Sequence, residues 1–113
     1  MKTVITGGTL IDGTGSGPVE NSVVAFEGGV ITAAGPAGEY RIPEDADVID
    51  AAGRTVIPGL IDCHIHMDLH GYADTYDENL VEERVRVIRT VREMEQTLGM
   101  GITTVRNLGS VNQ

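Results

Sequence analysis

The stretch Pro58-Gly-Leu-Ile-Asp-Cys-His-Ile-His66 is the most informative part of this chain of 113 residues. It is almost wholly apolar, as is typical of a parallel strand covered on both faces, and it ends in two histidines one position apart. Side chains at positions i and i+2 of a strand point to the same face, with α-carbons roughly 6.5–7 Å apart. His64 and His66 can therefore converge on one metal ion, at the strand end where α/β barrels keep their active sites.

The flanking sequence predicts further short strands, most of them interrupted by glycine. Gly28-Gly29 predicts a two-residue hairpin turn, because glycine tolerates positive φ. The loop Asp12–Pro18 is rich in glycine, but no lysine follows at the spacing of a phosphate-binding loop, so we interpret it as a turn. The predicted strands are 2–5, 9–11, 22–27, 30–34, 48–51, 55–57 and 102–106.

Apolar residues spaced by three or four positions predict one helix before the last strand. Asn79 is the expected N-cap and Gly99 the expected stop. The apolar face is expected to pack inward, and the charged face with Arg86 to meet solvent. The preceding loop, 68–78, leaves the end of the histidine strand and should overhang the site.

This frame resembles the metal-dependent amidohydrolase superfamily. The segment Thr55–His66 is similar to the first barrel strand of that family, and Gly28–Gly35 and Val48–Thr55 are similar to the β-segments that precede it. Gly101–Gly109 resembles the second barrel strand, most closely in the branch of imidazolonepropionase-like and Xaa-Pro dipeptidase-like enzymes. Asn107 departs from that pattern, which has Asp at this position.

The resemblance implies an α/β fold: the start of a (β/α)8 TIM-like barrel, preceded by a small N-terminal β-sandwich segment. Residues 1–57 would belong to the sandwich, and residues 58–113 would supply the first strand, first helix and second strand of the barrel. A complete barrel needs about 250 residues. We therefore expect the remainder of the barrel to come from the same parent protein or from a second chain. Two strands alone leave an apolar edge that favours aggregation, so a stable monomer is not expected.

The resemblance also implies hydrolysis of an amide or peptide-like C–N bond in a small molecule by metal-activated water. His64 and His66 would bind a divalent metal, one or two ions, with zinc as the default and Fe, Mn, Co or Ni as alternatives. The general base and the remaining ligands are expected beyond Gln113. A homo-oligomer is expected for the complete enzyme.

Three other functions stay open. A deaminase of a cyclic base would use the same opening motif with one metal. A non-catalytic structural protein of the same fold would lose its ligands, and the intact His64 and His66 argue against it. One half of a split enzyme, complemented by a second polypeptide, is the third.

Several residues near the histidines are secondary candidates. Asp62 and Asp68 share the strand parity of the histidines, and either could orient an imidazole. The alternative for Asp62 is a structural hydrogen bond inside the strand. The alternative for Asp68 is an ordinary loop residue. Cys63 has the opposite parity and is expected to be a buried thiol facing the helical layer. His70 and Tyr72 lie in the overhanging loop and are candidate substrate contacts; a third metal ligand at His70 is less favoured.

Arg106 ends the second predicted strand on the same rim. Its guanidinium could bind a substrate carboxylate through two parallel hydrogen bonds, or form an ion pair inside the barrel.

Composition narrows the class of partner. The net charge is −9, from 17 acidic and 8 basic residues, which does not favour nucleic acid. A single cysteine allows no intrachain disulfide and suits a reducing compartment. No run approaches the roughly 18 apolar residues of a membrane span, and no signal peptide is visible. We expect a cytoplasmic protein that binds no membrane.

Overall fold

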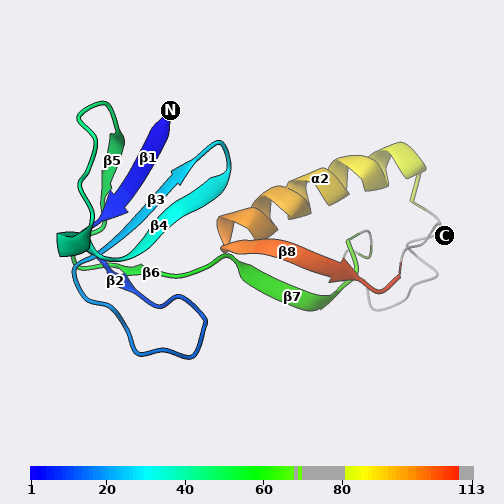
Figure 1. Ribbon diagram of the computed structural model, residues 1–113. Helices are drawn as coiled ribbons and strands as arrows, with labels where there is room; N and C mark the ends of the chain where they lie inside the picture. Colours follow the sequence, from blue (N-terminus) through cyan, green and yellow to red (C-terminus); the bar gives the residue numbers. More distant parts are fainter. Residues whose placement is uncertain (68, 70–80, 110–113) are drawn as a thin grey trace. The chain divides into compact units, whose positions relative to one another are not determined.

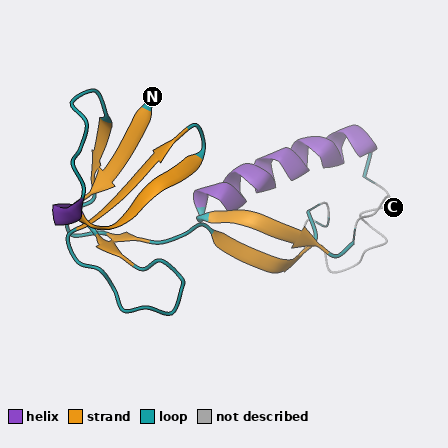
Figure 2. Ribbon diagram, in the orientation of Figure 1, coloured by secondary structure: helices purple, strands orange, loops and turns teal. Residues whose placement is uncertain are grey.

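The computed structural model describes residues 1–67, 69 and 81–109, and the chain divides into two compact units, Met1–Pro58 and Gly59–Gln113 (Figure 1). Strands dominate the first unit, and the second combines two strands with one helix (Figure 2). The first unit contains β1 (Lys2–Thr6), β2 (Thr9–Leu10), β3 (Ser22–Glu27), β4 (Val30–Pro36), the 3-10 helix η1 (Ala37–Glu39), β5 (Asp47–Asp50) and β6 (Thr55–Val56).

A four-stranded sheet in the order β4-β3-β1-β5 forms the centre of the first unit, and β2 and β6 form a separate parallel pair. β1 is antiparallel to β3 and parallel to β5. The register sets Val4 opposite Ala25. These two side chains and Val23 are buried and form the core cluster, because partly buried apolar side chains pack against it: Ala33, Ala37, Tyr40 and Ala46.

Glycines make two features of this unit possible. Gly28 and Gly29 have φ angles of 58° and 80°, which confirms the predicted hairpin turn between β3 and β4. Gly8 lies so close to the segment after β5 that a Cβ there would come within 3.0 Å of the Ala51 carbonyl oxygen and the Arg54 carbonyl oxygen. A side chain at Gly8 would force these segments apart.

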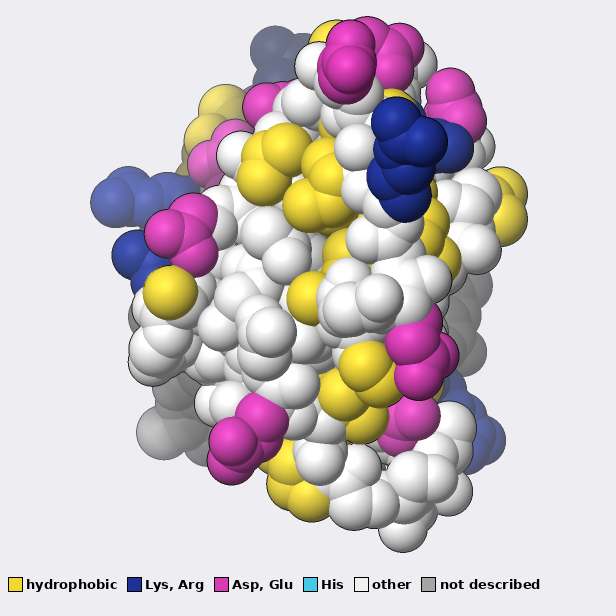
Figure 3. Space-filling view, turned by 60° about the vertical axis from the view of Figure 1, so that its left-hand side comes forward, with side chains coloured by type: hydrophobic (Ala, Val, Ile, Leu, Met, Phe, Trp, Pro, Cys, Tyr) yellow, Lys and Arg dark blue, Asp and Glu magenta, His cyan; other side chains and the backbone are white. Residues whose placement is uncertain are grey.

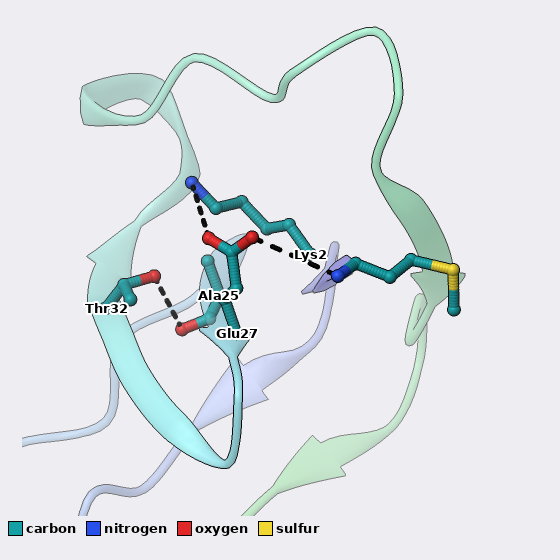
Figure 4. A network of polar contacts seen from close by, with 5 residues as sticks. Lys2, Ala25, Glu27 and Thr32 are labelled. Carbon is teal, nitrogen blue, oxygen red and sulfur yellow. Dashed lines mark hydrogen bonds and ion pairs between the residues drawn. The ribbon is translucent and has the colours of Figure 1, made fainter.

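Polar contacts near the hairpin end of β3 tie it to both neighbours (Figure 4). The Glu27 carboxylate lies 3.8 Å from Lys2 Nζ and 4.0 Å from the N-terminal amine of Met1. The Thr32 hydroxyl donates a hydrogen bond of 3.3 Å to the Ala25 carbonyl oxygen. These exposed ion pairs contribute little to stability, on the order of 0–1 kcal/mol each.

The second unit contains β7 (Leu60–Ile65), α2 (Glu83–Gly99) and β8 (Ile102–Asn107). β7 and β8 are parallel, with Leu60 opposite Ile102 and Ile65 opposite Asn107 (Figure 1). Gly59 makes the closest approach: a Cβ there would lie 2.8 Å from Thr103 Cβ and 2.6 Å from Thr103 Cγ2. The two strands meet at this point because residue 59 has no side chain.

The expectation that the histidine strand is covered on both faces is wrong for the described chain. Leu60 is 49% exposed and Ile61 68% exposed. Cys63, expected to be a buried thiol, is exposed as well. The physical reason is that β8 is the strand neighbour of β7 in the described residues, and α2 has its main strand contacts with β8.

The expected orientation of the helix is confirmed only in part. Arg86 is buried, whereas Ile88 is 71% exposed and Leu98 61% exposed. Arg86, Arg89 and Glu93 on the polar face each take part in at least one specific interaction. Part of the apolar face remains near the sheet, because Met94 and Leu98 line a hollow of about 200 Å³ with residues of β8.

The ends of the helix differ slightly from the prediction. Its N-cap is Glu82, without a side-chain capping bond, so Asn79, which lies outside the described residues, is not the cap. Gly99 is the last helical residue. The left-handed conformation falls at Gly101, with a φ of 88°. The Gly101 N–H donates to the Leu98 carbonyl oxygen, as is usual where a glycine follows the C-cap.

The surface is mixed in character. Apolar side chains lie between acidic and basic ones on the face shown in Figure 3. In the described part of the chain, no helix is long and apolar enough to cross a membrane.

Candidate metal centre

His64 and His66 turn their imidazoles toward each other at the end of β7. The two Nε2 atoms are 3.3 Å apart, the ring centroids are 5.3 Å apart, and the ring planes make an angle of 67°. The same-face placement predicted from the i, i+2 spacing is therefore confirmed. His64 is exposed and His66 is half-buried, so neither is a core histidine in the described chain.

His66 is oriented by a main-chain acceptor. Its Nδ1 lies 3.3 Å from the Gly109 carbonyl oxygen, which follows the end of β8. A carbonyl oxygen can only accept, so this contact is a hydrogen bond when Nδ1 carries the proton. Nε2 of His66 is then left with a free lone pair directed at His64. A hydrogen bond from one ring nitrogen commonly fixes which nitrogen of a histidine is available to a metal.

Asp62 acts on the main chain of the strand. Its Oδ1 accepts a hydrogen bond of 3.0 Å from the backbone N–H of His64. Of the two roles open to Asp62, this contact agrees with the structural hydrogen bond, since the carboxylate bonds to the backbone rather than to an imidazole. It holds the backbone of His64 directly before the pair of rings.

The arrangement fits two ligands of one divalent ion. Two nitrogen ligands at Zn–N distances of about 2.0–2.1 Å in a tetrahedral site are roughly 3.3–3.4 Å apart. The Nε2 atoms of His64 and His66 are separated by 3.3 Å. Within residues 1–67, 69 and 81–109, no group of three or more His, Cys, Asp or Glu side chains could hold a metal ion. The described residues thus supply two ligand atoms of the usual tetrahedral set.

Of the remaining candidate residues, some lie outside the described residues and one lies within them. Asp68, His70 and Tyr72 lie outside them. Arg106 lies on β8 and is exposed. The Oδ1 atom of Asn107, the last residue of β8, lies 3.4 Å from the backbone nitrogen of Gly109 and accepts its hydrogen bond.

Gly109 is the residue that sequence reasoning missed. Its contribution is a backbone carbonyl, which any residue type could supply, so residue identity carries no signal for it. The parallel pairing of β7 and β8 gives the available signal: their carboxyl ends lie at one edge, so residues after β8 come close to His66.

Comparison with known proteins agrees with this frame. Residues 47–102 match the sequence pattern described as the amidohydrolase family. The chain belongs to the amidohydrolase family. The match includes β7, His64 and His66 and ends at the first residue of β8.

Individual relatives are enzymes that act on C–N bonds. The chain is 47% identical to the imidazolonepropionase of Acidiphilium cryptum (strain JF-5) over 60 residues, 53% of this chain and 15% of that protein. It is 44% identical over 85 residues to a 5-methylthioadenosine/S-adenosylhomocysteine deaminase of Symbiobacterium thermophilum, with 72% of this chain and 19% of that protein covered.

A solved prolidase in complex with N-methylphosphonate-L-proline has the same fold over this region. The TM-score is 0.84 at 29% identity, and the match covers 96% of this chain and 26% of the prolidase. This chain therefore spans about a quarter of the length of that prolidase and 15% to 19% of the length of the two curated relatives.

Proposed function

We propose that this chain is the N-terminal part of a metal-dependent amidohydrolase that hydrolyses an amide or peptide-like C–N bond of a small molecule. In this proposal, unit Gly59–Gln113 supplies the first two strands and the first helix of a barrel. The remainder of the barrel, from the same parent protein or another chain, covers the apolar surfaces of β7 and α2. The match of residues 47–102 to the amidohydrolase family and the likeness of 96% of the chain to a solved prolidase support this arrangement.

The observation that carries the proposal is the separation of 3.3 Å between the Nε2 atoms of His64 and His66. These two residues would bind the ion, and zinc is the default because neutral imidazole nitrogens and a tetrahedral separation suit it. The chemistry that such an ion supplies when bound is a water molecule acidified toward neutral pH and a polarised carbonyl group.

Two contacts within this chain keep the two imidazoles in place. Asp62 holds the main chain at His64, and the Gly109 carbonyl holds the ring of His66. Both contacts act before substrate arrives, so the ligand atoms are preorganised. Arg106 lies near the end of β8, the strand that precedes Gly109. We propose that its guanidinium contacts a carboxylate of the substrate.

The test is metal content together with product analysis on the natively assembled protein. Elemental analysis and native mass spectrometry should find zinc or another divalent metal in the wild type. His64→Ala combined with His66→Ala should lose it. Cys63→Ser is the matched control, since Cys63 directly precedes His64, has the opposite strand parity, and its replacement should keep the metal. Equal metal content in all three proteins would contradict the proposed site.

Product analysis separates the second candidate, a deaminase of a cyclic base. The similarity to a deaminase over 72% of the chain supports this second candidate function. Hydrolysis of a peptide-like substrate gives a new carboxylate and an amine, whereas deamination releases ammonia and leaves the ring intact. A screen of dipeptides and cyclic bases, with ammonia assayed in each case, should give carboxylate products with dipeptides. Ammonia release from the bases alone would favour the deaminase.

A further inference from the structure

The short turn after β8 contacts the end of β7 at two successive residues. The Leu108 N–H donates a hydrogen bond of 3.0 Å to the Ile65 carbonyl oxygen. The Gly109 carbonyl oxygen lies 3.3 Å from His66 Nδ1. The turn itself is closed by Asn107, whose Oδ1 accepts from the Gly109 N–H at 3.4 Å. These contacts link the side chain of Asn107 to the ring of His66 through one residue.

We propose that Asn107 is a positioning residue for the metal centre. By closing the turn, it places the Gly109 carbonyl against His66 Nδ1. The proton of His66 then stays on Nδ1, and Nε2 faces His64 unprotonated. This inference rests on the proposed function, because its consequence is a ligand atom ready for a metal ion. Outer partners of this kind typically change metal affinity by about 10- to 100-fold when they are removed.

The geometry shows why the carbonyl of Gly109 matters rather than its lack of a side chain. A Cβ on Gly109 would lie 3.6 Å from His66 Nδ1 and 3.7 Å from Cε1, which is ordinary contact. Steric room is therefore not the reason for the approach. The position of the carbonyl is set by the hydrogen bonds of the turn, and the side-chain bond among them comes from Asn107.

The type of side chain at position 107 gives a sharp set of variants. Asparagine offers an amide oxygen that accepts from the N–H two residues ahead, as in other turns of this kind. Aspartate offers a carboxylate oxygen at the same place, so Asn107→Asp should preserve the bond. Asn107→Ala removes it. Thr104→Ala is the matched control, because Thr104 is another exposed polar residue of β8 and has no contact with the turn among the described bonds.

The experiment is nitrogen NMR on natively assembled, metal-free protein labelled with [15N]histidine, followed by a competition titration with zinc. His66 should carry its proton on Nδ1 in three proteins: the wild type, the Asn107→Asp variant and the Thr104→Ala variant. In Asn107→Ala, the two tautomers should compete, and zinc affinity should fall by about 10-fold. Assignment of His66 comes from loss of its signals in His66→Ala.

Two results would overturn the inference: a His66 proton on Nε2 in the wild type, or an unchanged tautomer and zinc affinity in folded Asn107→Ala. If Asn107→Ala does not fold by circular dichroism, Asn107→Leu takes its place, since leucine keeps the shape and lacks the acceptor. Absence of zinc binding in the wild type would contradict the proposed function. Zinc binding that is the same in all folded variants would contradict only the role of Asn107.

Discussion

The two units of this chain differ in how they treat apolar surface. In Met1–Pro58, the central strands bury Val4, Val23 and Ala25 almost completely. In Gly59–Gln113, Ile61 and Ile88 are 68% and 71% exposed. The first unit covers its core with its own residues, including Ala37 of η1 and Tyr40, whereas β7 and α2 of the second leave comparable side chains uncovered in the described chain.

This contrast teaches that local geometry and burial are separable. The imidazoles of His64 and His66 meet at 3.3 Å although their strand is exposed. Strand parity, the parallel partner β8 and the turn after it are enough to bring them together. Barrel closure is therefore expected to add further ligands and exclude water rather than to create this pair.

The sharpest way to test that separation is to remove one ligand from the open unit. His64→Ala should lower the kcat/KM of the assembled enzyme by about 10³-fold, since a bound metal stabilises hydrolytic transition states by several kcal/mol. In this chain by itself, without metal, the thermal midpoint should stay close to the wild-type value, because His64 is exposed there. Steady-state kinetics and calorimetry check both expectations. Ile61→Val on the same strand is the control and should keep the activity of the wild type. Loss of activity in His64→Ala with full metal content would contradict the role of His64 as a metal ligand.

The next effect concerns the closest packing of the open unit. Gly59→Ala should destabilise the protein by about 3 kcal/mol, because its Cβ would overlap the side chain of Thr103, including Cβ at 2.8 Å. Chemical denaturation measures the change in unfolding free energy.

Gly99→Ala is the matched control. A Cβ at Gly99 meets nothing within 4 Å, and the residue is helical, so this change should be neutral or stabilising by up to about 1 kcal/mol. Equal effects of the two substitutions would mean that the approach of β7 to β8 is not tight.

Much of this fold follows from local sequence. Glycine punctuation and short apolar runs located the described strands to within a few residues, and the i, i+2 spacing of His64 and His66 predicted their shared face. Burial could not be predicted in the same way. Cys63 and Arg86 were assigned to the wrong environment because parity and periodicity define the faces of an element, but not which face finds a partner.

The site shows the same division between side chain and main chain. Histidine carries chemistry in its side chain, so sequence pointed to it. Gly109 acts through a carbonyl, and its distance from His66 depends on the register of two strands that are far apart in sequence. From sequence, Asn107 is marked only by its departure from the Asp of the family pattern.

A direct comparison of the two units comes from truncating one apolar side chain in each. Val4→Ala should cost about 2 kcal/mol, because Val4 is 0% exposed and its removal leaves a cavity among Val23 and Ala25. In the isolated chain, Ile88→Ala should change stability by less than about 0.5 kcal/mol, since Ile88 is 71% exposed. Denaturant unfolding of the isolated chain and of the natively assembled protein measures both. A larger cost for Ile88→Ala in the assembled protein alone would locate the missing cover of α2; equal costs in the isolated chain would abolish the contrast.

The smallest effect concerns a hydrogen bond between an aspartate side chain and the backbone, which occurs in both units. Asp12, like Asp62, accepts a hydrogen bond from the backbone N–H two residues ahead. The backbone N–H and the hydroxyl of Thr14 hold the pKa of Asp12 below its usual value of 3.8. A carboxyl group with a depressed folded-state pKa stabilises the protein above its unfolded pKa, and that contribution is lost as pH falls through the folded value.

Thr14→Val removes the hydroxyl and keeps the N–H, so the pKa of Asp12 should move part of the way up toward 3.8. Carboxyl NMR titration measures the shift, and the acid limb of stability should move to slightly higher pH. Ser16→Ala is the control, because Ser16 bonds to Thr14 and not to Asp12. An unshifted Asp12 in Thr14→Val would assign the whole depression of its pKa to the backbone N–H of Thr14.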